Sequence, residues 1–236
     1  MAWNELSRFS LLLLVAVIAG EARAQLYFRV DAGYSSSVRA NFSDNSSNGF
    51  LICGDAACTS PGSFKDYGHA PVLEAGMGYA FSPAIRTDLV FGRRKYDLRT
   101  SDEGNPGSTF SADITSEDLM ANGYYDFSMS GWKPYLGIGL GAARNKMSNL
   151  SLISLSVPAS VDGGTRSNFA WAFMAGAGIP AWGKTTLDIG YRYINLWKVE
   201  IPPGPVTING VVIPFPQYGG ANGRVIANEL TLGVRF

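Results

Sequence analysis

The last residues of the chain, Glu229-Leu230-Thr231-Leu232-Gly233-Val234-Arg235-Phe236, alternate between two kinds of side chain. One series is apolar, and the other is charged, hydroxylated or glycine. An alternation of period two is typical of a β-strand whose two faces lie in different surroundings. This stretch therefore predicts a strand that runs to the final residue, Phe236.

The same alternation recurs along the chain before this strand. It predicts further strands over residues 26–34, 72–81, 86–94, 118–127, 135–142, 169–179 and 187–193. The connections at 82–84, 128–133 and 180–184 are short, whereas those near 36–70, 99–114, 147–167 and 197–224 are long. Short turns on one side and long loops on the other are typical of an outer-membrane barrel. We therefore predict an all-β fold, an eight-stranded antiparallel up-and-down transmembrane β-barrel.

The two faces of the predicted strands differ sharply in polarity. One face is almost entirely apolar, and the other is rich in glycine and charge. The charged positions are Arg29, Asp31, Glu74, Arg86, Asp88, Asp126, Asp188, Arg192, Glu229 and Arg235, with Arg94 near the outer end. The interior of an eight-stranded barrel is just wide enough for side chains, so bulky apolar residues from every strand would crowd it. The apolar face is therefore expected to contact lipid, although a soluble, lipocalin-like barrel remains the alternative.

Aromatic side chains gather near both ends of the predicted strands. Those at the short-turn ends are Tyr79, Phe81, Tyr125, Phe127, Trp132, Trp182 and Phe236. Those at the long-loop ends are Tyr34, Tyr96, Phe169, Trp171, Tyr193 and Trp197. Two such belts are expected where a barrel crosses the two membrane interfaces.

The N-terminal segment reads as an export signal. Residues 9–19 form an apolar run that is too short to span a bilayer, and Ala22-Arg23-Ala24 matches a cleavage site. We predict a signal peptide over residues 1–24 and a barrel domain over residues 25–236, with Gln25 as the first mature residue. A buried apolar helix is the alternative interpretation of the run.

The charge balance limits the choice of partner. Lys plus Arg and Asp plus Glu number 19 each, so the net charge is zero. Because phosphate-backbone binding needs a basic face, nucleic acid is not an expected partner. The single histidine, His69, excludes a multi-histidine metal site. No cofactor is predicted.

Three stretches resemble a known family. They are residues 120–127 leading into 134–141, residues 187–193, and the closing stretch 228–236. The chain is similar to the small outer-membrane β-barrel family that includes opacity proteins, OmpX, the transmembrane part of OmpA and alphaproteobacterial surface antigens. The resemblance implies a place in the outer membrane of a Gram-negative bacterium, among lipid and lipopolysaccharide. It also implies that Phe236, Val234 and Leu232 form the signal that the barrel-assembly machinery recognises.

The resemblance raises one enzymatic alternative, because a few such barrels modify lipid A. One of these enzymes is a hydrolase with a serine and histidine pair, so His69 is the candidate. Such a pair needs a neighbouring serine and an orienting carboxylate. No recognisable arrangement of this kind accompanies His69, and the chain is predicted not to be an enzyme.

The long loops carry further signals. Cys53 and Cys58 flank Gly-Asp-Ala-Ala, and an exported location permits a disulfide between them, although a metal site with additional ligands is the alternative. Asn209-Gly210 predicts a type I′ hairpin. The apolar residues of the third and fourth loops mark either an interaction surface or a cap over the barrel.

Two functions remain open at this point. The charged interior is either a salt-bridged network that fills the barrel or a path for ions, and unpaired buried charge is costly. The first hypothesis is a non-enzymatic surface protein, in which the barrel anchors loops for an adhesin, antigen or envelope structural role with an extracellular ligand. The alternative is a narrow porin-like channel for ions or small solutes.

Overall fold

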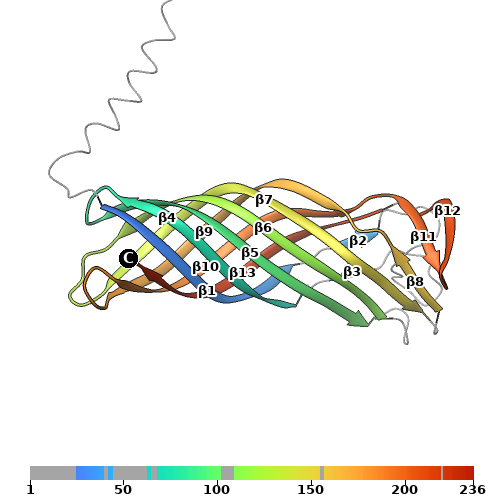
Figure 1. Ribbon diagram of the computed structural model, residues 1–236, viewed down its shortest axis with the longest axis horizontal. Helices are drawn as coiled ribbons and strands as arrows, with labels where there is room; N and C mark the ends of the chain where they lie inside the picture. The colour runs from blue at the N-terminus through green and yellow to red at the C-terminus, as the bar shows by residue number, and fades with distance from the viewer. Residues whose placement is uncertain are drawn as a thin grey trace, which may run out of the picture.

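The computed structural model describes residues 25–39, 42–44, 63–64, 68–101, 109–154, 157–218 and 220–236. Within these ranges, eight long strands pair antiparallel around a closed barrel (Figure 1). They are β1 (Gln25–Arg39), β4 (His69–Ala80), β5 (Ile85–Ser101), β6 (Thr109–Asp126), β7 (Lys133–Ser154), β9 (Thr165–Pro180), β10 (Thr186–Ile201) and β13 (Ala221–Arg235). The predicted fold class is confirmed. The proposed signal peptide over residues 1–24 lies outside the described residues.

The two ends of the barrel domain close the sheet. β13 pairs with β1 in a register that sets Val234 opposite Val30. The final residue continues this ladder, because Phe236 N–H donates to Phe28 O at 3.0 Å and Phe28 N–H donates to Phe236 O at 2.8 Å. Closure satisfies the backbone groups that an open edge would leave unpaired in hydrocarbon. No helix in the described ranges is long and apolar enough to cross a membrane.

The polarity of both faces inverts along several of the long strands, and β5 shows this clearly. Its outward series reads Ile85, Thr87, Leu89 and Phe91, and then Arg93, Lys95 and Asp97. Its inward series reads Arg86, Asp88, Val90, Gly92 and Arg94, and then Tyr96 and Leu98. Lipid therefore surrounds the short-turn part of the strand, where the outside is apolar, and water surrounds the long-loop part.

An apolar core fills the long-loop part of the barrel, as in a soluble protein. We call this the outer core. Its larger members are Tyr96, Leu98, Ile114, Met147, Leu150, Val161, Ile194, Leu196, Val199, Ile201, Val206 and Val225. The predicted polar interior is present only in the membrane-level part of the barrel. The prediction that Tyr96 belongs to the outer aromatic belt is wrong, because its side chain is fully buried inside the barrel.

The long connections also contain strands, of which only the hairpin around Asn209-Gly210 is predicted from the sequence. β8 (Val157–Val161) pairs with the outer end of β7 and with β11 (Gly204–Ile208), which pairs with β12 (Val211–Tyr218). β2 (Phe42–Asp44) pairs with β13 and with β3 (Ser63–Phe64). Figure 1 shows β11 and β12 at the end of the molecule opposite the short turns. The β11–β12 and β7–β8 pairs are local hairpins, whereas β8–β11 and β2–β13 join segments that are distant in sequence, and local alternation does not predict those pairings.

The turn between β11 and β12 has the predicted backbone. Asn209 and Gly210 have φ values of 48° and 79°. Type I′ turns need positive φ at both central residues, which Asn and Gly tolerate best. The hairpin prediction is confirmed.

Candidate functional site

The candidate site is the barrel interior, and its part nearest the short turns holds a connected set of charges. We call Arg29, Asp31, Arg86, Asp88 and Asp126 the turn-side cluster. Arg29 donates to Asp31 through Nε and Nη2, both at 2.8 Å, and through Nη1 to Asp88 at 3.0 Å. Arg86 Nε lies 3.0 Å from each oxygen of Asp126. Opposite charges thus meet within β1, between β1 and β5, and between the adjacent strands β5 and β6.

Aromatic and amide groups complete the turn-side cluster. The Arg86 guanidinium lies 3.8 Å from the ring centroid of Tyr124 and 4.8 Å from that of Tyr135. Asp88 accepts hydrogen bonds from Asn122 Nδ2 at 2.8 Å and from Tyr27 Oη at 3.2 Å. A cation held over aromatic faces is stabilised by the ring quadrupole. These contacts fix the orientation of each charged group.

A second set of charges lies between the turn-side cluster and the outer core. We call Glu74, Arg94, Asp118, Arg192 and Glu229 the middle cluster. Arg94 bonds to Asp118 and to Glu229, and its Nη2 lies 3.2 Å from Glu74 Oε1. Arg192 bonds to Glu74, and its Nε donates to Glu229 Oε2 at 2.8 Å. All five residues are buried, so each charge depends on its partners rather than on water.

Glycine makes room for the middle cluster. A Cβ on Gly92 would lie 2.8 Å from Asp118 Oδ1 and 2.9 Å from Glu74 Oε1. Any larger residue there would therefore displace the carboxylates that Arg94 binds. The glycine-rich inward face of the predicted strands fits two interpretations equally well. The glycines either make room for long arginine side chains or leave a narrow water channel.

The layers of side chains leave little space between them. A chamber between the two clusters has a volume of about 10 Å³ and is lined by Arg29, Glu74, Asn122 and Arg192, among others. Beyond the middle cluster, Ser35 Oγ lies 2.7 Å from Tyr96 Oη, where the outer core begins. The described interior thus consists of charge-paired layers capped by an apolar one.

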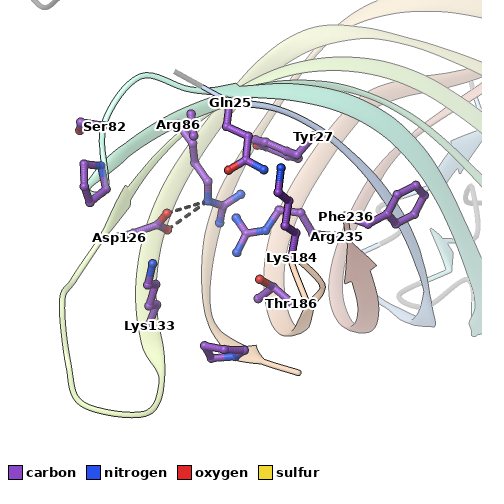
Figure 2. Close-up of a pocket in the computed structure, with 13 residues that line it drawn as sticks. Gln25, Tyr27, Ser82, Arg86, Asp126, Lys133, Lys184, Thr186, Arg235 and Phe236 are labelled. Carbon is purple, nitrogen blue, oxygen red and sulfur yellow. Dashed lines mark hydrogen bonds and ion pairs between the residues drawn. The ribbon is translucent and has the colours of Figure 1, made fainter. Parts of the chain in front are cut away.

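The short-turn end of the barrel opens into a pocket of about 560 Å³ (Figure 2). Arg86, Lys133, Lys184 and Arg235 contribute to its walls, together with Asp126. The Nη2 atom of Arg235 also lies 3.4 Å from Oδ1 of Asp188. Two residues of the turn-side cluster, Arg86 and Asp126, line the pocket and connect it to the charged interior.

All ten charged positions singled out from the sequence lie on the inward face. Arg29, Asp31, Glu74, Arg86, Asp88, Asp126, Asp188, Arg192 and Glu229 are buried, and Arg235 lies at the pocket with intermediate exposure. Arg94, which the sequence places near the outer end of the same face, is also buried in the network, and the structure adds Asp118, which shares the inward phase of its strand. The alternation in the sequence therefore indicates the inward orientation of both residues. The hydrogen-bonding roles of Ser35, Tyr96 and Tyr124 had no comparable signal.

The other singled-out residues take separate places. His69 is exposed at the start of β4, and its ring stacks on Tyr34 with centroids 5.2 Å apart. Among the described residues, no serine or carboxylate hydrogen bonds to the His69 side chain. Cys53 and Cys58 lie outside the described residues. Leu232 and Phe236 of the proposed assembly signal are exposed on the lipid-facing side of the barrel, and Val234 is partly exposed there.

A family model for the outer membrane protein beta-barrel domain matches residues 9–236. The chain belongs to this family. The resemblance found in the sequence is therefore confirmed, and the barrel is an outer-membrane barrel with its short turns on the periplasmic side.

Individual proteins match the chain over part of its length or at low sequence identity. Outer membrane protein PagN of Salmonella typhimurium is 36% identical over 126 residues, which are 50% of this chain and 47% of PagN. An uncharacterized protein of Brucella abortus is 29% identical over 141 residues, which are 51% of this chain and 50% of that protein. The chain thus spans about half the length of the curated relatives it matches. Neisserial surface protein A has a solved structure with a TM-score of 0.49, 18% identity, and coverage of 90% of this chain and 97% of its own.

Proposed function

We propose that this protein is a non-enzymatic surface protein, whose barrel carries an interaction surface above the outer membrane. The observation that carries the proposal is the small sheet formed by β8, β11 and β12, which we call the tip sheet. It continues from the outer end of β7, beyond the level at which the outward face of the barrel becomes charged. The outer core supports it from inside, because Leu150, Val161 and Val206 belong to that core.

The tip sheet exposes two apolar side chains that the outer core does not cover. Val211 and Val212 begin β12 directly after the turn, and they are 66% and 59% exposed. The sequence left open whether the apolar loop residues form a cap or an interaction surface. The buried members support a cap, and these two valines support an interaction surface at its edge. Exposed apolar patches often mark sites of protein contact.

The experiment measures the adhesion of bacteria that lack other adhesins and express this protein. Residues 204–218 are replaced by a Gly-Ser linker, and a second variant carries Val211→Asp and Val212→Asp. Binding to cultured epithelial cells and to matrix-coated surfaces should fall to the vector level in both. A matched control with Leu140→Ala, on the lipid-facing side of β7, should bind as the wild type does. Binding that survives loss of the hairpin, at equal surface expression, contradicts the proposal.

The channel alternative has less support. A solute would have to cross the two charge clusters and the outer core, and the chamber between the clusters has a volume of only about 10 Å³. The buried charges are proposed as a structural network, because each one has an opposite charge within ion-pair distance.

A further inference from the structure

We infer that the periplasmic mouth of the barrel is a binding site for a small solute carrying phosphate or carboxylate groups. The mouth pocket is the 560 Å³ pocket at the short-turn end. Its size is that of a small-molecule site, since ligand pockets commonly measure about 300–1,000 Å³. This site lies at the opposite end of the molecule from the tip sheet, so it is independent of the proposed surface role.

Cationic groups reach the mouth pocket from separate elements. Arg86 comes from β5, Lys133 begins β7, Lys184 lies in the turn before β10, and Arg235 ends β13. Figure 2 shows the ends of Arg86, Arg235 and Lys184 turned toward the middle of the pocket. Groups of one sign that converge from several strands focus the field within the opening.

The carboxylates around the mouth pocket do not use all of these donors. Asp126 is the acidic residue found among the described lining residues, and it binds Arg86 through Nε. Arg86 Nη1 lies 4.0 Å from Asp88, which is beyond hydrogen-bond distance. In the described part of the chain, neither Lys133 nor Lys184 has a carboxylate within ion-pair distance. The lining of the pocket therefore holds more cationic side chains than carboxylates.

The arginine at the bottom of the mouth pocket is held in place. Asp126 fixes Arg86 at Nε, and the rings of Tyr124 and Tyr135 lie close to its guanidinium. A guanidinium fixed in this way keeps a planar fork of donors, which matches the oxygens of phosphate and carboxylate groups. Because the fork is preorganised, less side-chain entropy is lost when an anion binds.

Neutral groups extend the mouth pocket beyond the cations. Gln25, Ser82 and Thr186 also line it, and they add donors for the uncharged part of a solute. Cleavage after Ala24, which the sequence predicts, would place the new α-amino group on Gln25 at the same opening. That amino group would add a further positive charge to the site.

The test uses the processed protein, extracted from outer membranes in zwitterionic detergent and labelled with ¹⁵N-tryptophan. Pyrophosphate and citrate are the probes. Trp132 and Trp182 flank the two lysines of the mouth pocket, whereas Trp171 and Trp197 lie toward the outer end. Saturable shifts of the Trp132 and Trp182 indole signals, with Trp171 and Trp197 unchanged, are expected. The response should weaken as salt is added, because exposed charges are screened.

The decisive comparison is between two variants of equal charge. Lys133→Gln with Lys184→Gln should weaken pyrophosphate binding about tenfold, since each lysine contributes a partly exposed ion pair. Lys146→Gln with Lys198→Gln removes two exposed lysines from the outer end and should leave binding unchanged. Equal weakening in both variants, or no saturable shift with either probe, overturns the inference.

Two sources could supply the anion, and a vesicle experiment separates them. The barrel is reconstituted in phosphatidylcholine vesicles with or without phosphatidylglycerol. Weaker pyrophosphate binding in the anionic vesicles would show that lipid headgroups occupy the mouth pocket. Unchanged binding would show that the pocket is reserved for soluble periplasmic anions.

Discussion

Arg94 connects more of the interior than its neighbour on β5 does, because it faces inward and contacts Glu74, Asp118 and Glu229. Arg93, one position earlier, points outward, and its side chain is 63% exposed. The two arginines are adjacent in sequence and differ only in the face of the strand they occupy. They therefore form a matched pair for measuring what the buried network contributes.

Replacing Arg94 with methionine should destabilise the barrel by about 3–5 kcal/mol, because buried Asp118 then loses its arginine and Glu74 and Glu229 are left to share Arg192. Arg93→Met should change stability by less than about 1 kcal/mol, since its ion pair with Glu117 is exposed to water. Urea unfolding in detergent, followed by the heat-modifiable gel shift, measures both. Similar stability in the two variants would mean that the middle cluster contributes little.

Gly92 illustrates a steric requirement at the residue scale. Gly92→Ala should cost about 1–3 kcal/mol, because the added methyl group meets the carboxylates of Glu74 and Asp118. Gly123→Ala on β6 is the control, since open space surrounds its Cβ position. The same unfolding assay applies, and an unaffected Gly92→Ala variant would show that the cluster can rearrange.

At the scale of elements, β7 passes through two environments. Leu140 lies on its lipid-facing side, whereas Leu150 lies ten residues later inside the outer core and pairs in register with Val161 of β8. One strand thus anchors in the membrane and supports the tip sheet above it. Its continuity explains why the tip sheet has a defined position.

Leu150→Ala should loosen the tip sheet without opening the barrel. Truncating a buried leucine costs about 2–5 kcal/mol, and the loss falls on the contacts with β8 and β11. We expect faster proteolysis within residues 157–218, with the heat-modifiable mobility of the barrel retained. Leu140→Ala should leave the proteolysis rate unchanged. Equal rates in the two variants would mean that the outer core does not hold the tip sheet.

At the scale of the whole molecule, the barrel is an elongated body with different chemistry at its two ends (Figure 1). The periplasmic end is an open basic pocket, and the outer end is a sheet supported by an apolar core. Between them lie the paired charges of the membrane-level interior. The layers have this order because the strands leave the lipid part-way along the barrel. Beyond that level the outward face is polar and the inward face is apolar.

Planar-bilayer recordings test whether this interior conducts. The purified barrel, with folding verified by its gel mobility, should give no discrete conductance steps. A general porin reconstituted in the same way serves as the control for insertion. Reproducible steps from the folded barrel would favour the channel alternative, and Arg192→Ala and Glu229→Ala should then change their size.

The chain alone specifies the eight barrel strands, the face that their membrane-level side chains occupy and the closed barrel. These follow from local alternation, because a period of two places every second residue on the same face whatever its partner is. The same alternation places all ten charged positions inside, and it indicates the inward orientation of Asp118 and Arg94 as well.

The partners of those residues required the folded molecule. Arg94 and Glu229 are 135 positions apart in sequence, and they meet because the register around the closed barrel brings β5 and β13 to one level. The outer core, the tip sheet and the mouth pocket likewise depend on contacts between distant segments. Local pattern determines which way a residue points, whereas only strand register and barrel closure decide which residue it meets.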